Sequence, residues 1–119
     1  RNINAKLMDK LLVSLAPDVI IPRRIEQYRE TFALYMCLVK KRDSLLKYLI
    51  KNNIEAKVHY PIPLNKQKAA KNLNLNQKNF ITANKQAKQI ITLPIHQYVS
   101  KKQILYIVQK IKKFYKKKD

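Results

Sequence analysis

The 119-residue sequence contains no glycine, one cysteine and seven acidic residues. Without glycine, no glycine-rich loop can wrap a phosphate group. The single Cys37 cannot form a disulfide within the chain, and one cysteine with two histidines does not make a zinc site. The carboxylates are mostly single and flanked by lysine, so no pair suggests a general acid and base. We therefore expect no catalytic, cofactor-binding or metal-ligating residue within this chain.

Long apolar runs are also absent. No run approaches the roughly 18 residues that a membrane-spanning helix needs, and the amphipathic start "RNINAKLMDKLL" does not resemble a secretory signal. Hydrophobic residues make up 46% of the chain, which argues against disorder, and the length fits one domain over 1–119. Cys37 lies in the apolar run "FALYMCLV" and is predicted to be a core residue, which fits a cytoplasmic protein. Because the chain lacks an initiator Met, we expect a piece of a longer protein.

The formal net charge is +19. A surface this basic attracts polyanions such as nucleic acid or anionic membrane. However, 21 of the basic residues are Lys and only five are Arg, whereas base readout and bidentate phosphate binding favour Arg. Lys, Asn and Ile, all abundant here, have A/T-rich codons. Two interpretations therefore stay open: a basic nucleic-acid-binding module, or a charge that reflects genome composition. The end of the chain, "KIKKFYKKKD", is predicted to be partly a helix face and partly a solvated tail.

Apolar periodicity predicts an α+β domain, with a small, mostly antiparallel sheet of about three strands and helices packed on one face. Residues 31–40 are apolar on both faces, which predicts a central strand covered on both sides. Asp43 is a candidate helix cap, Asn52-Asn53 can end that helix because Asn tolerates the left-handed conformation, and Ser100 is predicted to cap the last helix. The predicted strands are 19–21, 31–40 and 54–60, and the predicted helices are 3–15, 44–53, about 64–73, about 78–90 and a last one after Ser100.

The stretch "KVHYPIPL" (57–64) carries two prolines directly after a histidine and a tyrosine. Pro61 keeps Tyr60 extended and Pro63 does the same to Ile62, so the backbone is stiff. A stiff segment loses little entropy on binding, which suits a rim that holds His59 and Tyr60 against a ligand. The alternative is an ordinary strand-to-helix joint, with Tyr60 in the core and His59 in solvent.

Two longer segments resemble a known family. "LYMCLVKKRDSLLKYLIKNNIEAKVHYPIPLNKQKA" and "AKQIITLPIHQYVSKKQILYIVQKIKKFY" are similar, in order and spacing, to the C-terminal small domain of the DegT/DnrJ/StrS sugar aminotransferases. In that family an apolar strand leads to an Arg-Asp helix, a "HYP-x-PLH" segment, an "SLP" turn and a closing amphipathic helix. The resemblance covers nearly the whole chain, and "HYPIPL" is its most specific part.

The resemblance implies a pyridoxal-phosphate-dependent enzyme that moves an amino group, usually from glutamate, onto a keto sugar linked to a nucleotide. It implies that the large cofactor-binding domain is missing here, that the complete enzyme is a homodimer, and that the fragment alone is inactive. By resemblance, His59 and Tyr60 are the substrate-binding residues. Lys57, on the face of His59, could meet a diphosphate or simply be solvated.

The sequence departs from the family at three positions. Asn65 and Ala33 stand where the family often has histidine, and Asn53 replaces a glycine. Asn tolerates the left-handed conformation that glycine would supply. The other two departures leave open an inert remnant domain with only a packing role. That alternative expects His59 to be buried and bonded to backbone, rather than to line a cleft.

Overall fold

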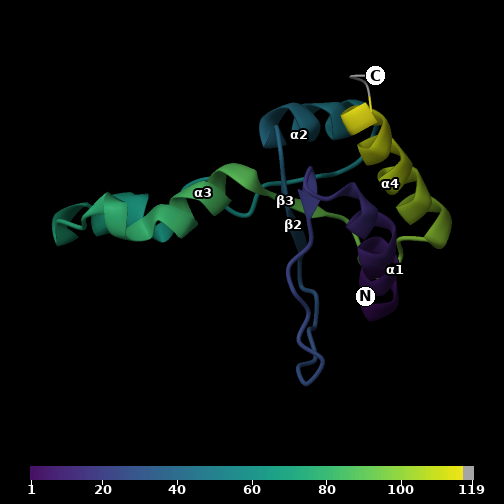
Figure 1. The fold of residues 1–119 in the computed structure, drawn as a ribbon, viewed down its shortest axis with the longest axis horizontal. Coiled ribbons are helices and arrows are strands. Elements are labelled where there is room, and N and C mark those ends of the chain that lie inside the picture. Colours follow the sequence, from purple (N-terminus) through teal and green to yellow (C-terminus); the bar gives the residue numbers. More distant parts are fainter. Residues whose placement is uncertain (117–119) are drawn as a thin grey trace.

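The computed structural model describes residues 1–116, which form a three-stranded antiparallel sheet with helices packed against it (Figure 1). The strand order is β1 (Val19–Ile20), β2 (Tyr35–Val39), β3 (Ile90–Leu93), so β2 is central. Val19 pairs with Val39, and Tyr35 pairs with Leu93. The predicted α+β class and the central position of the strand within 31–40 are confirmed. The predicted solvated tail lies partly outside the described residues.

The third strand differs from the prediction. Residues 54–60 contribute only one isolated bridge, between Lys57 and Thr92, and the sheet takes Ile90–Leu93 instead. The amide of Ala56 donates to the carbonyl of Ile54, which folds the backbone at the start of the segment. Pro61 and Pro63 have no N–H with which to continue a ladder beyond it. The alternation of 54–60 therefore yields a short contact with β3 rather than a strand.

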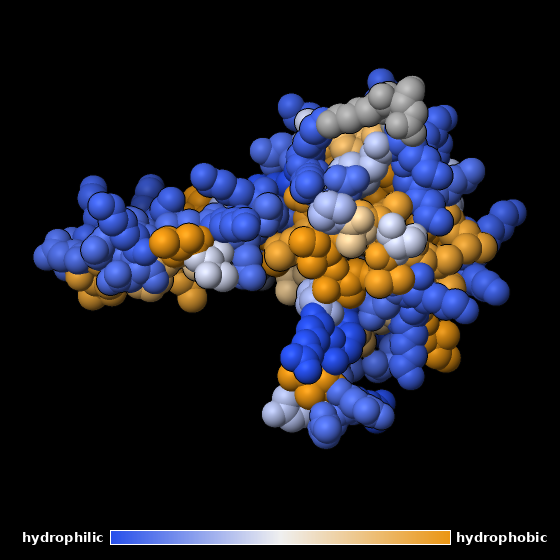
Figure 2. All heavy atoms as spheres, in the orientation of Figure 1, coloured by the Kyte–Doolittle hydropathy of each residue, from blue (hydrophilic) through white to orange (hydrophobic). Residues whose placement is uncertain are grey.

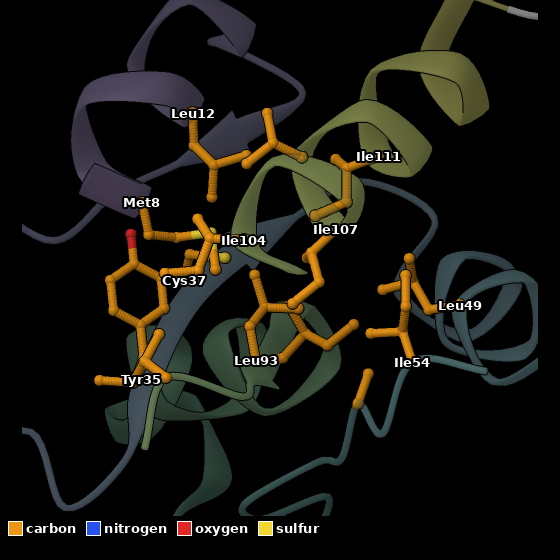
Figure 3. Packing of buried hydrophobic residues seen from close by; sticks show 14 of the residues in the cluster. Met8, Leu12, Tyr35, Cys37, Leu49, Ile54, Leu93, Ile104, Ile107 and Ile111 are labelled. Carbon is orange, nitrogen blue, oxygen red and sulfur yellow. The ribbon is translucent and has the colours of Figure 1, made fainter. Parts of the chain in front are cut away.

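Two helices cover one face of the sheet. α1 (Asn2–Leu12), extended by the 3₁₀ turn η1 (Val13–Leu15), and α4 (Lys101–Lys116) lie over the face that carries Tyr35 and Cys37 (Figure 3). The buried side chains of the two helices are Ala5, Met8, Leu12, Ile104, Ile107, Val108 and Ile111. Cys37 is buried as predicted, and loss of solvation raises the pKa of its thiol to about 12. Cys37 is therefore a core residue, inert as a nucleophile.

The opposite face of β2 is less well covered than predicted. Met36 and Leu38, which alternate with the buried residues of the strand, are only half-buried. The prediction of a strand covered on both sides is wrong for this face, because α1 and α4 gather on the other one. The face of β2 that carries Met36 and Leu38 is therefore partly exposed to solvent.

The helix after β2 starts two residues earlier than expected. α2 (Arg42–Lys51) follows Lys41, which is in the left-handed conformation (φ 54°), so Asp43 is not the cap. Asp43 instead lies in the first turn, where a negative charge complements the helix dipole. The helix stops as predicted, with Asn53 left-handed at φ 63°. Asparagine thus replaces the missing glycine at this position.

Arg42 is buried although it is charged. One of its terminal nitrogens donates to the carbonyl oxygens of Ala87 and Ile90, both at 2.9 Å, and its Nε donates to Asp43 at 2.8 Å. Ala87 and Ile90 lie where α3 (Ile81–Gln89) ends and β3 begins. A single side chain therefore joins the start of α2 to the entry of β3.

The last helix begins as predicted. The Ser100 Oγ accepts from the amide of Gln103 at 3.1 Å, and the Gln103 side chain accepts from the amide of Ser100 at 2.8 Å. This reciprocal pair is a capping box and satisfies two amides that the helix leaves unpaired. Of the helices within residues 1–116, none has the length and apolarity needed to cross a bilayer.

Residues 61–86 project from the body as an arm (Figure 1). The predicted helix over 64–73 is wrong, since the chain forms the 3₁₀ turns η2 (Leu64–Lys66) and η3 (Lys68–Leu73) there. The predicted helix over 78–90 is split into η4 (Gln77–Phe80) and α3, and β3 takes Ile90. No residue of the arm is buried. A longer α-helix has little to stabilise it here, because helices in proteins depend on burying an apolar face.

Candidate functional site

A cavity of about 270 Å³ lies where residues 55–59 meet β3. Its size is just below the usual range for small-molecule sites. The walls combine apolar side chains with several cationic or hydrogen-bonding groups. The lining residues are Arg1, Ala33, Leu34, Tyr35, Glu55, Lys57, His59, Thr92, Leu93, Pro94, Ile95 and His96. Of the two residues singled out from the sequence, His59 lines this cavity and Tyr60 does not.

His59 is held in place by Thr92. Its Nδ1 lies 2.8 Å from the Thr92 Oγ, and the His59 ring is half-buried. Thr92 is fixed in turn, because it exchanges both backbone hydrogen bonds with Lys57, at 3.1 and 2.8 Å. The contact engages one ring nitrogen and leaves Nε2 as the ring nitrogen that can meet a ligand.

Tyr60 lies outside the core, with 69% of its surface exposed. The alternative that placed Tyr60 in the core is therefore wrong. A cis peptide joins it to His59, and the two rings meet edge to face at 5.3 Å between centroids. Tyr60 thus packs against the side chain that enters the cavity and remains free for contacts on its other side.

The charges around the cavity are mostly positive or neutral. Lys57 Nζ lies 2.9 Å from Glu55 Oε1 at the surface, and this hydrogen bond holds the pKa of the Glu55 carboxyl below its usual value. Arg1 donates to the carbonyl oxygens of Phe32 and Ala33 at 3.0 and 2.9 Å. The lining thus contains one carboxylate, two cationic side chains and two imidazoles, a balance that favours an anionic ligand.

A partly buried polar network lies behind the cavity wall. The Tyr35 hydroxyl donates to Asp9 at 2.6 Å, and Arg24 binds both oxygens of the same carboxylate at 3.0 and 3.1 Å. Burial first, and then the hydrogen bond to Asp9, raise the pKa of Tyr35 above its ordinary value. The network ties α1 to β2 and to the loop before it, and so fixes one wall of the cavity.

Tyr35 predicts a specific pH dependence of stability. Because its phenol keeps its proton in the folded state to a higher pH than in the unfolded state, its contribution is complete below about pH 10 and is lost as the pH rises further. In Tyr35→Phe the free energy of unfolding should therefore fall less steeply between about pH 10 and 12, by about 1.4 kcal/mol per pH unit. Denaturant unfolding of both proteins across this range measures the difference. Parallel curves would contradict the assignment, since the two proteins differ only in the hydroxyl of residue 35.

Thr92, Tyr35 and Arg1 are site residues that the sequence reasoning missed. Thr92 had a signal, because it is the one polar residue in the apolar run "IITLPI". Tyr35 and Arg1 had none, since their contacts are made across the fold. His96 lines the cavity, and its Nδ1 accepts from the amide of Tyr98 at 3.2 Å.

The positions of the family departures are also informative. Ala33 lines the cavity, whereas Asn65 lies in the arm and donates to Gln77 and Asn84 at 2.6 and 2.9 Å. Within residues 1–116, no group of three or more His, Cys, Asp or Glu is arranged to hold a metal ion.

Comparison with known proteins gives one consistent result. Residues 1–112 match the model of the DegT/DnrJ/EryC1/StrS aminotransferase family. The chain is 29% identical over 117 residues to a pleiotropic regulatory protein of Geobacillus stearothermophilus, covering 98% of this chain and 32% of that protein. It is 26% identical over 98 residues to the dTDP-3-amino-3,6-dideoxy-α-D-galactopyranose transaminase of Aneurinibacillus thermoaerophilus, covering 82% and 26%. The chain thus spans about a third or less of these relatives.

A solved structure shares the fold. A DegT/DnrJ/EryC1/StrS aminotransferase from Brucella abortus superposes with a TM-score of 0.87 at 24% identity, covering 98% of this chain and 30% of that one. The match includes the sheet, its covering helices and the arm, because almost none of the chain lies outside it.

Proposed function

Because the chain belongs to the DegT/DnrJ/EryC1/StrS aminotransferase family, we propose that it is the C-terminal small domain of a pyridoxal-phosphate-dependent aminotransferase that acts on nucleotide-linked keto sugars. The observation that carries this proposal is His59, fixed on Thr92 at the wall of a cavity that Arg1 and Lys57 also line. A nucleotide-linked sugar carries a diphosphate, so a positive cavity beside a stiff, proline-bounded segment suits it. The named activity of the Aneurinibacillus relative, a transaminase of a dTDP-linked sugar, supports this substrate class.

In this proposal the domain forms the rim of the substrate pocket. His59 Nε2 meets the substrate, and Tyr60 contacts it from outside the cavity. Lys57 and Arg1 attract the negative charge of the diphosphate. Since Pro61 and Pro63 hold the backbone and Thr92 holds the imidazole, little freedom is lost when the substrate binds.

The residues of this chain do not fit pyridoxal phosphate by themselves. Pyridoxal phosphate, when bound, supplies an aldehyde carbon for the amino group and a ring that withdraws electrons from it. Holding it takes an activated lysine, and activation by burial is not available to Lys57, which is 60% exposed and paired with Glu55. The cofactor therefore belongs to the remainder of the enzyme, which we propose to be a cytoplasmic homodimer with glutamate as amino donor.

The arrangement of His59 favours this proposal over an inert remnant. The remnant hypothesis expects His59 buried and bonded to backbone, whereas its ring is half-buried, bonded to a side chain and in contact with a cavity. A nucleic-acid module would instead need interleaved aromatic side chains along a basic groove. Tyr98 and Tyr106 instead line a separate hollow, whose walls within residues 1–116 carry no lysine or arginine.

The test uses the protein encoded by the complete reading frame that contains this chain. We expect it to show cofactor absorbance between roughly 300 and 500 nm that glutamate shifts and borohydride removes. It should then transfer the amino group to a keto sugar linked to dTDP or UDP. A purified, folded protein that binds no pyridoxal phosphate would refute the proposal. The nucleic-acid-binding module and the inert remnant would then be the preferred hypotheses.

A further inference from the structure

The arm (residues 61–86) is ordered without a core of its own. None of its residues is buried, and Leu64 and Leu73 are 85% and 65% exposed. Figure 2 shows apolar side chains gathered along the lower edge of the projection. Fixing a residue's backbone costs about 1–2 kcal/mol, which globular domains offset by burying apolar surface. Of its apolar residues, the arm buries only Pro63, Ala70 and Phe80 within residues 1–116, and each of them only in part.

The hydrogen bonds within the arm are made by exposed or half-buried side chains. Asn65 donates to Gln77 and Asn84, and Gln77 donates back to the carbonyl of Asn65 at 3.1 Å. Exposed hydrogen bonds of this kind contribute little net stability, because water competes for both partners. They define the shape of the arm but do not offset the cost of ordering it. A covering surface is needed.

The comparison with the Brucella structure indicates where that surface is. The match covers 98% of this chain, arm included, at 24% identity, and the matched part is 30% of the Brucella chain. A segment without buried residues would not keep its conformation between sequences this different unless other parts of the protein packed on it. In the Brucella protein, those other parts are the remainder of its chain, outside the matched 30%. We expect a corresponding part in the complete protein that contains residues 1–119.

The charge of the arm defines the chemistry of the surface that covers it. The arm contains five lysines and no acidic residue. A second copy of this chain, with a net charge of +19, would repel it. A nucleic acid would not cover Leu64 and Leu73, which call for an apolar surface.

We infer that the arm docks onto an acidic surface with an apolar centre, supplied by the part of the protein outside residues 1–119. The inference rests on the proposed function, which places such a part in the same protein. The arm begins directly after His59 and Tyr60, so docking also fixes the rim of the cavity. Loss of docking should therefore loosen the site that these residues form.

Hydrogen exchange in the complete protein tests the inference. Peptides spanning residues 64–80 should exchange slowly, and the double variant Leu64→Asp/Leu73→Asp should speed their exchange by about tenfold or more. Both side chains are exposed within residues 1–116, so the variant leaves the domain core intact. A second variant, Lys66→Glu/Lys68→Glu/Lys71→Glu, keeps the apolar contacts and should also speed exchange. Val13→Asp is the matched control, because Val13 is 63% exposed and lies outside the arm.

Carbodiimide coupling of the same protein identifies the surface. Lys66, Lys68 or Lys71 should be joined to carboxylates outside residues 1–119. Fast exchange of the arm in the unmodified protein, or coupling only to a second copy of residues 1–119 or to another protein, would overturn the inference. The cofactor absorbance separates the two proposals. If the arm is protected from hydrogen exchange but the cofactor absorbance is absent, the proposed function is refuted and the docking inference stands. If the absorbance is present but the arm exchanges freely, only the docking inference is refuted.

Discussion

Arg42→Met is expected to lower the free energy of unfolding by about 2–4 kcal/mol. The buried guanidinium donates to the carbonyl oxygens of Ala87 and Ile90, and methionine fills similar space without a donor. Both carbonyl oxygens then lose a charge-assisted hydrogen bond where α3 gives way to β3. Denaturant unfolding followed by far-ultraviolet circular dichroism measures the loss.

Two variants on the same helix distinguish the role of Arg42 from a general effect of charge. Lys47→Met removes an exposed cation and should change stability by less than about 0.5 kcal/mol. Asp43→Asn breaks the pair with Arg42 at an 83% exposed carboxylate and should cost less than about 1 kcal/mol. If Arg42→Met proved no more destabilising than these two, the junction between α2 and β3 would not depend on this side chain.

Thr92→Val in the complete enzyme is expected to weaken binding of dTDP or UDP by about tenfold, the equivalent of one lost orienting hydrogen bond. Valine keeps the shape of Thr92 and its place in β3, but it leaves the Nδ1 of His59 without its partner at 2.8 Å. Thr92→Ser restores the hydroxyl and should bind like the unmodified protein. Isothermal titration of each variant gives the affinities.

A double-mutant cycle identifies the route by which Thr92 acts. His59→Ala alone should weaken nucleoside-diphosphate binding by about tenfold to a hundredfold, since it removes a ligand contact. If Thr92 acts by orienting His59, adding Thr92→Val to His59→Ala should cost nothing further. Additive losses would show that Thr92 contributes independently, and unchanged affinity in His59→Ala would remove His59 from the substrate site.

Local rules predicted those parts of the fold in which neighbouring residues decide the conformation. Ser100 and Asn53 could be identified from the sequence because a cap and a left-handed residue depend on side-chain chemistry within a few positions. The central strand was recognised from its apolar residues, although the sequence could not show that one face would remain half open. The third strand was misassigned because only long-range pairing distinguishes the two segments: 90–93 pairs with β2, whereas 54–60 makes a single bridge to β3.

The candidate site was predicted in part for the same reason. His59 was found because prolines and a family resemblance mark its segment, and both signals lie next to it in sequence. Thr92, 33 positions away, is its partner through an antiparallel bridge that no local pattern announces. The alternative that placed Tyr60 in the core assumed a regular strand over 54–60, and the backbone of that segment is not a regular strand.

The order in which the sheet is assembled has a consequence for synthesis of the protein. Within this domain β2 is made before its partner β3 and its covering helix α4, at residues 90–93 and 101–116. During that interval the nascent chain carries an apolar strand with one edge unpaired and a face that α1 covers without α4, a state that favours aggregation. Translation that stalls before α4 would leave this strand uncovered, so the final turns of the domain also decide whether the first two thirds stay soluble.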